Sequence, residues 1–485
     1  MGVWTRKNVA DLQIEAGDTD EGQHTLKRSL GPLNLIFIGV GGIIGAGIFV
    51  LTGQAAAEHA GPAIALSFVL AGFACLCAGL CYAEFAAMIP IAGSAYTYAY
   101  ATMGELVAWI IGWALVLEYL VAASAVAVGW SGYFTAFLGE LGIHLPQSLT
   151  SAPLAFDAAG HLVTTGALLN VPAMSLVGVL TIFLIVGIKE SANFNNVMVA
   201  VKLTIVLLVI VFGSMYVNPD NWHPFVPPAE GPGKFGYSGV VAGAATIFFA
   251  YIGFDGVSTV AQEARNPQRD MPIGILGSLV LCTILYILMA LVMTGLAPYK
   301  ELAVPHPVFV AIDHAGPKLR WLGYAVNVGA IAGLASVVMV LLLSQSRVFY
   351  TMARDGLFFP MFAKIHPHFR TPHLGTLVIG LCSGLVAATL PIGVIGHLVS
   401  LGTLSAFVMV CAGIWVLRRL HPELARPFRA PWVPVIPIFG VLSCGYMMIS
   451  LPRETWELFI GWMAIGVVIY FLYGRRHSRI SKRHP

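Results

Sequence analysis

Apolar runs of membrane-crossing length recur along the whole chain, and they constrain its fold more than any other feature. Each is close to the roughly 20 residues that a helix needs to cross the hydrocarbon core of a bilayer. The twelve runs lie at about 33–53, 62–88, 104–138, 171–188, 195–217, 237–262, 273–297, 321–349, 374–390, 394–418, 433–451 and 456–473. Only 10% of the 485 residues are charged and 58% are hydrophobic, whereas a soluble domain has about 25% charged residues. The sequence therefore predicts an all-α polytopic membrane protein.

Lys and Arg outside the apolar segments gather in the two tails and in alternate connections. By the positive-inside rule, this bias predicts a cytosolic N-terminal tail at 1–32 and a basic cytosolic C-terminal tail at 474–485. The first 30 residues lack the apolar region of a secretory signal peptide. We therefore expect an uncleaved, multi-pass protein of the inner (plasma) membrane. The net charge of +3 then reflects topology and lipid headgroups, and no nucleic-acid partner is expected.

Two long outer connections, 139–170 and 218–239, are rich in Pro and Gly. Such composition is typical of irregular loops, and neither segment has the length or pattern of a separate domain. We expect the chain to form one membrane domain.

Five glycines interrupt the first apolar segment, in the stretch GVGGIIGAGIF at 39–49. A glycine in a helix interior costs about 1 kcal/mol relative to alanine. A dinucleotide-binding loop does not explain them, because Ile44 occupies the sixth position of G-x-G-x-x-G and no strand precedes it. Close helix packing explains part of the pattern. A second interruption at 246–259, TIFFAYIGFDGVST, favours a pair of broken helices, as in transporters that bind substrate at the membrane midplane.

Four stretches closely resemble one superfamily of membrane transporters: GVGGIIGAGIF, YAEFAAMIPIAGSAYTYAY (82–100), FFAYIGFD (248–255) and EARNPQRDMP (263–272). They resemble the amino acid–polyamine–organocation superfamily, and within it the bacterial branch of the cationic amino acid transporter family. The resemblance runs from about residue 26 to 475. It implies a LeuT-like fold with two inverted five-helix repeats, at 33–217 and 237–418, and two further helices at 433–473. It also implies secondary active uptake of α-amino acids by alternating access, with the proton as coupling ion and no cofactor.

The resemblance further implies that backbone groups at the two interruptions bind the substrate. The N–H groups expected to bind the α-carboxylate belong to Gly45, Ala46 and Gly47. The carbonyls expected to bind the α-ammonium belong to Ile43, Ile44, Phe249, Ala250 and Ile252. The side chains of Phe249 and Ile252 would shape the pocket for the variable part of the substrate. Ordinary packing against lipid or core is the alternative for both.

Charged residues inside predicted membrane helices are functional candidates, because each costs about 2.5–3.5 kcal/mol at the helix centre. Lys202 lies in NNVMVAVKLTIVLLVIV. The resemblance implies that its ammonium group approaches the first interruption, where sodium-coupled relatives of the fold hold Na⁺. Snorkelling to the inner interface is one alternative, and carriage of the transported proton is another. Glu118, in ALVLEYLVAA, is a candidate for carrying the proton, for pairing with a basic substrate, or for a structural hydrogen bond.

Two further acidic residues are candidates for gating the inner side. Asp255 follows the second interruption, where it could cap the inner half-helix or help to gate the exit. Glu84 lies near the inner end of the second segment and is expected to support the cytosolic gate. No pattern of His, Cys and acidic residues predicts a metal site. The cysteines all fall in apolar segments, where helix packing is their expected role.

Other function classes fit the sequence less well. A channel needs a continuous polar pore lining, and a membrane enzyme such as an acyltransferase needs catalytic groups gathered at one interface; neither pattern is present. Polyamine/amino acid exchange and uncoupled passage of cationic amino acids remain alternatives. The expected pocket has no acidic cluster, which favours broad or neutral selectivity over strict arginine specificity. The expected partners are the amino acid substrate and the lipid bilayer, and the sequence does not predict an oligomeric state.

Overall fold

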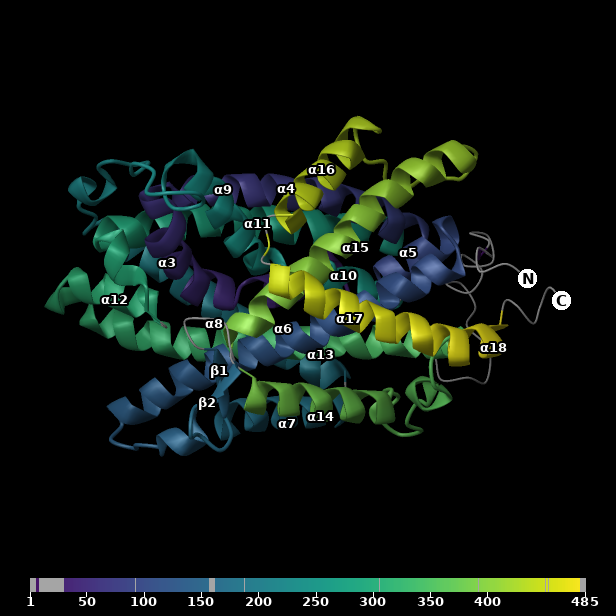
Figure 1. Ribbon diagram of the computed structural model, residues 1–485, viewed down its shortest axis with the longest axis horizontal. Helices are drawn as coiled ribbons and strands as arrows, with labels where there is room; N and C mark the ends of the chain where they lie inside the picture. Colours follow the sequence, from purple (N-terminus) through teal and green to yellow (C-terminus); the bar gives the residue numbers. More distant parts are fainter. Residues whose placement is uncertain are drawn as a thin grey trace.

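The computed structural model is a bundle of apolar helices that run mainly along its longest axis (Figure 1). It describes residues 6–7, 30–91, 93–156, 162–186, 188–304, 306–390, 392–449, 451 and 453–479. Within these residues, eight helical runs are long and apolar enough to cross a membrane, and four shorter apolar helices accompany them. The prediction of an all-α polytopic membrane protein is confirmed.

The helices correspond closely to the predicted apolar segments. In chain order, the longer ones are α2 (Pro32–Ile43), α4 (Ile64–Met88), α6 (Glu105–Glu140), α7 (Val171–Val186), α8 (Ile188–Ser214), α9 (Gly236–Ile247), α11 (Pro267–Leu296), α13 (Arg320–Arg354), α14 (His373–Thr389), α15 (Ile392–Leu420), α16 (Val435–Ile449) and α17 (Arg453–Ile469). The shorter ones are α3 (Thr52–Ala55), α5 (Ala95–Thr102), α10 (Gly256–Thr259), α12 (Pro307–His314) and α18 (Arg475–His477).

Helices that are distant in the sequence pack together around the two glycine-rich segments. Helix α11 packs against both α2 and α4, and α13 packs against both α6 and α8. Helix α15 contacts α6 and α16, while α7 and α14 lie side by side along one flank (Figure 1). This arrangement places α2 among α8, α11 and α13, so the first glycine-rich segment is surrounded by other helices.

The outer connection at 139–170 contains more regular structure than predicted. Strands β1 (Leu154–Phe156) and β2 (Leu162–Thr164) pair antiparallel, with Ala155 opposite Val163. The prediction of an irregular loop was therefore wrong for this part. The two strands consist largely of β-formers and apolar residues, and the surrounding Pro and Gly residues obscured them. The connection at 218–239 has a short 3₁₀ turn at Pro219–Trp222 and no strand among its described residues.

Both ends of the described chain meet at one end of the bundle. Asp355 accepts a hydrogen bond of 2.5 Å from the Lys7 ammonium group, and its carbonyl accepts one of 3.0 Å from the Arg479 N–H. Helices α5 and α18 lie at this end, and α3 and α12 lie at the other (Figure 1). Most of the predicted N-terminal tail (8–29) and the last residues (480–485) lie outside the described residues. The repeat boundaries at 33–217 and 237–418 stay a prediction.

Candidate transport site

The first membrane crossing is broken at its glycine-rich centre. Helix α2 ends at Ile43, and Ile44 is extended, with φ −75° and ψ 101°. Helical structure resumes as the π-helical segment η1 (Gly47–Leu51), followed by α3. The N–H groups at the start of a helix have no acceptor within it. The predicted carboxylate-binding groups of Gly45, Ala46 and Gly47 therefore lie where a new helix begins.

The second break lies in the crossing formed by α9 and α10. After α9, the 3₁₀ turn η6 (Phe248–Tyr251) is followed by Ile252, which is extended with φ −61° and ψ 137°. Gly253 has φ +112°, in the left-handed region that glycine alone adopts at low cost. The chain then turns into α10 at Gly256.

The two breaks pack directly against each other, and this contact requires glycine. A Cβ atom placed on Gly47 would lie 2.2 Å from the Ala250 Cβ and 2.5 Å from its Cα. A Cβ atom on Gly253 would lie 2.8 Å from the carbonyl of Gly42. Both explanations of the glycines, close helix packing and a broken helix, therefore apply to this stretch. Glycine allows the two backbones to approach closely, and it occurs where the helix is broken.

Lys202 of α8 binds the first break with all three of its ammonium hydrogens. The Nζ atom donates to the Gly41 carbonyl at 2.9 Å, to the Ile44 carbonyl at 2.8 Å and to the Ser336 hydroxyl at 2.8 Å. Its side chain is fully buried, so it does not snorkel to an interface. Three acceptors match the three donors of a protonated amine, and the Gly41 and Ile44 carbonyls flank the end of α2.

Tyr286 of α11 connects the two breaks. Its hydroxyl lies 2.7 Å from the Ile43 carbonyl at the end of α2 and 2.8 Å from the Ala250 carbonyl in η6. The ring is fully buried and packs against Phe68 and Tyr251. Both carbonyls are among those assigned to the substrate ammonium from the resemblance.

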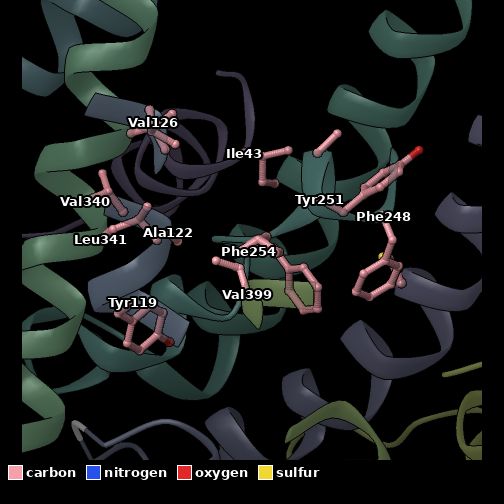
Figure 2. Packing of buried hydrophobic residues seen from close by; sticks show 14 of the residues in the cluster. Ile43, Tyr119, Ala122, Val126, Phe248, Tyr251, Phe254, Val340, Leu341 and Val399 are labelled. Atoms are coloured by element: carbon pink, nitrogen blue, oxygen red, sulfur yellow. The ribbon is translucent and has the colours of Figure 1, made fainter. Parts of the chain in front are cut away.

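Apolar side chains surround the breaks. Val337 and Val340 of α13 are the nearest side chains to Cβ atoms placed on Gly45 and Gly42, respectively. Figure 2 shows Val340 and Leu341 beside Ala122 and Val126 of α6, with Ile43 in the middle and Phe248 and Tyr251 on its far side. Of the side chains predicted to shape the pocket, Ile252 is buried and Phe249 is half-buried.

Two buried carboxyl groups, those of Glu118 and Asp255, lie near the apolar side chains that surround the breaks. Glu118 precedes Ala122 by four residues on α6 and is fully buried, and Asp255 is close enough to interact with it electrostatically. Neither carboxyl oxygen of Glu118 has a hydrogen-bond partner among the described residues, and the nearby Thr403 hydroxyl donates to the Val399 carbonyl.

The side chain of Asp255 is hydrogen-bonded by a residue of another helix, α6. Its Oδ2 atom accepts a short hydrogen bond from the Tyr119 hydroxyl. Although Asp255 stands at the N-terminus of α10, its side chain makes no capping hydrogen bond there. The structure therefore gives no support to the capping interpretation, and a role of Asp255 in gating the inner exit stays a prediction.

The comparisons with known proteins agree with this geometry. A family model described as "Amino acid permease" matches residues 30–471. The chain belongs to the amino acid permease family. The permease is 46% identical to the branched-chain amino acid permease BcaP of Bacillus subtilis (strain 168), over 99% of each chain. It is also 46% identical to the methylthioribose transporter of the same organism, over 94% of this chain and 96% of the relative.

A more distant relative connects the permease to the family predicted from the sequence. It is 38% identical to the vacuolar cationic amino acid transporter 4 of Arabidopsis thaliana, over 86% of this chain and 67% of the relative. The resemblance to the amino acid–polyamine–organocation superfamily is thus confirmed. The permease is a multi-pass amino acid transporter, not an enzyme.

Glu84 of the permease lies away from the breaks and binds a distant loop. Its carboxylate accepts hydrogen bonds from Arg418 at 2.5 and 3.0 Å and from the Ala430 N–H at 2.7 Å. Arg426 lies 3.4 Å from it. Glu84 is fully buried, so these contacts hold the connection between α15 and α16 against the end of α4. Its predicted role at the gate stays a prediction.

Sequence reasoning missed several residues that contact the permease's breaks. Tyr286 lies in LYILMA, where a single hydroxyl among apolar residues gives no signal of its own. Ser336 and Tyr119 share this property. The buried pair of Arg347 and Glu263, with an N···O distance of 3.1 Å, had a clearer signal, because Arg347 follows a long apolar run and Glu263 begins the recognised stretch EARNP.

Proposed function

We propose that this permease takes up α-amino acids with apolar side chains by alternating access at the two breaks, with the proton as coupling ion. The observation that carries the proposal is the direct contact of two broken helices. Their backbone N–H and carbonyl groups match the carboxylate and ammonium that all α-amino acids share, although Lys202 and Tyr286 already donate to three of the carbonyls. In this proposal the N–H groups of Gly45, Ala46 and Gly47 bind the carboxylate. The carbonyls of Ile43, Ile44, Phe249, Ala250 and Ile252 bind the ammonium.

The apolar surround supports a substrate with an apolar side chain. Val337, Val340, Leu341, Ala122 and Val126 offer no partner for a charged group, and burying an unpaired charge is strongly unfavourable. A branched aliphatic chain fits this chemistry, as the name of the BcaP relative also suggests. The name of the methylthioribose transporter relative suggests a second candidate substrate, a neutral thioether.

Lys202 acts in this proposal as a fixed cation at the first break. Three acceptors within 2.9 Å match the three hydrogens of its ammonium group, which favours the charged form at this site. We therefore assign the transported proton to the pair Glu118 and Asp255. Two carboxylates that interact in a low-dielectric interior cannot both be ionised at low cost, so the pair holds one proton and can exchange it.

The distribution of charge supports a proposed membrane topology. We place the permease in the plasma (inner) membrane, with the end that contains Lys7, Asp355 and Arg479 facing the cytosol. Basic residues gather at this end, and Arg354, Arg418 and Arg475 lie in the last turns of their helices or beyond. Glu84 then lies on the cytosolic side.

Uptake into proteoliposomes tests the proposed function. Radiolabelled leucine, isoleucine and valine should enter, and entry should increase with an inward proton gradient. Unlabelled leucine should compete, whereas arginine and putrescine should compete weakly or not at all. Competition by methylthioribose in place of leucine would replace the amino acid substrate with a thioether sugar. Uptake of arginine alone would contradict the proposed preference for apolar side chains.

A further inference from the structure

The hydroxyl of Tyr286 satisfies two carbonyls with a single hydrogen. It lies 2.7 Å from the Ile43 carbonyl and 2.8 Å from the Ala250 carbonyl. A tyrosine hydroxyl has one donor, so it serves one carbonyl at a time or both weakly. All three residues are buried, and a buried carbonyl without a donor is unfavourable.

Tyr286 occupies this position through packing that does not involve the breaks. Its ring centroid lies 5.2 Å from that of Phe68 and 5.5 Å from that of Tyr251. The Tyr251 hydroxyl donates to the Phe68 carbonyl at 3.0 Å. The ring of Tyr286 is therefore fixed by α4 and η6, and its hydroxyl lies between the two breaks, within reach of both carbonyls.

The same two carbonyls are assigned to the substrate ammonium in the proposed function, on which this inference rests. An ammonium group brings three donors, so a bound amino acid satisfies both carbonyls without help. An empty carrier has no such donor. When it closes, the breaks meet at Gly47 and Ala250, where the backbones already touch, and the two carbonyls depend on Tyr286.

The geometry points to Tyr286 as a positioning residue that replaces the substrate ammonium in the empty carrier. Its hydroxyl stabilises the closed empty form and adds little to the closed loaded form. A ligand or group shifts a conformational equilibrium only through such a difference between states. Tyr286 therefore lets the empty carrier return across the membrane, which makes the permease capable of net uptake rather than obligatory exchange.

Transport by Tyr286→Phe, measured in two kinds of proteoliposome, tests the inference. Vesicles without internal substrate report net uptake, which requires return of the empty carrier. Vesicles preloaded with unlabelled leucine report exchange, which does not. The substitution removes a hydroxyl that stabilises the closed empty form and adds little to the closed loaded form. We therefore expect net uptake to fall by about tenfold, while exchange stays within about twofold of wild type. Tyr446→Phe is the control, since it removes a tyrosine hydroxyl from an exposed position on α16, outside both breaks.

Three results would overturn the inference. In the first, Tyr286→Phe lowers net uptake and exchange by the same factor, as a purely structural residue would. In the second, Tyr286→Phe changes neither, or Tyr446→Phe changes the ratio equally. In the third, wild-type protein exchanges substrate but shows no net uptake; this measurement needs no variant and so does not depend on the folding of Tyr286→Phe. Failure of the proposed function gives a different result: wild-type protein then carries no apolar amino acid in either kind of vesicle. In that case the ratio of net uptake to exchange is measured with the substrate that the wild-type protein does carry.

Discussion

Lys202 donates a hydrogen bond of 2.8 Å to the carbonyl of Ile44, the residue at which the first membrane crossing leaves its helix. A cation placed on the free carbonyls of a broken helix stabilises the broken form, as a bound Na⁺ does in other transporters. The two residues are far apart in the sequence, and the bond fixes α8 against the end of α2. In the proposed function, Lys202 therefore serves as a covalently attached cation at this break.

Replacing Lys202 with methionine should reduce transport severely. The substitution keeps much of the apolar stem but removes the Lys202 donor from the Ile44 carbonyl. It also leaves the Gly41 carbonyl with only a 3.3 Å contact from the Ser336 hydroxyl. A buried group that loses its donor costs about 1–3 kcal/mol. We expect substrate affinity to fall by at least about tenfold and Tm to fall. Binding of radiolabelled leucine to the purified protein, with Lys318→Met as the exposed-lysine control, measures the effect. Wild-type affinity in Lys202→Met would refute the role of the ammonium group.

Glu118→Gln should separate transport from its coupling to protons. Glutamine keeps the size of the side chain and imitates the protonated carboxyl group, but it cannot exchange a proton. We expect leucine still to equilibrate across the vesicle membrane, while accumulation driven by an inward proton gradient is lost. The control is Glu58→Gln, which changes an exposed carboxylate. Gradient-driven accumulation at the wild-type level would assign the proton to another group, with Asp255→Asn as the next variant.

Gly47→Ala should block closure of the carrier. The added Cβ would lie 2.2 Å from the Ala250 Cβ and 2.5 Å from its Cα, so the backbones must separate. Overpacking of this kind costs about 1–3 kcal/mol, and it falls on the closed states through which transport passes. Uptake should fall at least about tenfold, while Gly132→Ala, with no atom near its Cβ, retains wild-type uptake. Normal uptake by Gly47→Ala would mean that the breaks separate widely during transport.

The parts of the site that the sequence predicts are those with an unusual residue in an unfavourable place. Glycines within an apolar helix and a lysine such as Lys202 each carry a cost that stands out against the surrounding pattern. Tyr286 was not predictable because a tyrosine suits an apolar helix equally well as a packing residue. The partners of Glu84 lie 334 and 346 residues away, in α15 and in the loop that follows it, and the Tyr119 contact of Asp255 depends on how two helices are rotated against each other. Local patterns contain neither kind of information.

Glu84→Gln should distinguish an anchor from a gate. The carboxylate of Glu84 is buried and binds Arg418 and the Ala430 N–H, and loss of one partner of a buried ion pair costs about 3–5 kcal/mol. Because a quarter of the Arg418 side chain is exposed to solvent, the cost should lie at or below the lower end of this range. We expect a lower Tm and unchanged uptake per molecule of folded protein, since the pair holds the loop before α16. The control is Arg453→Gln, which breaks an exposed pair with Glu457 and should leave Tm almost unchanged. A faster or slower uptake by folded Glu84→Gln at unchanged Tm would instead assign Glu84 to the gate.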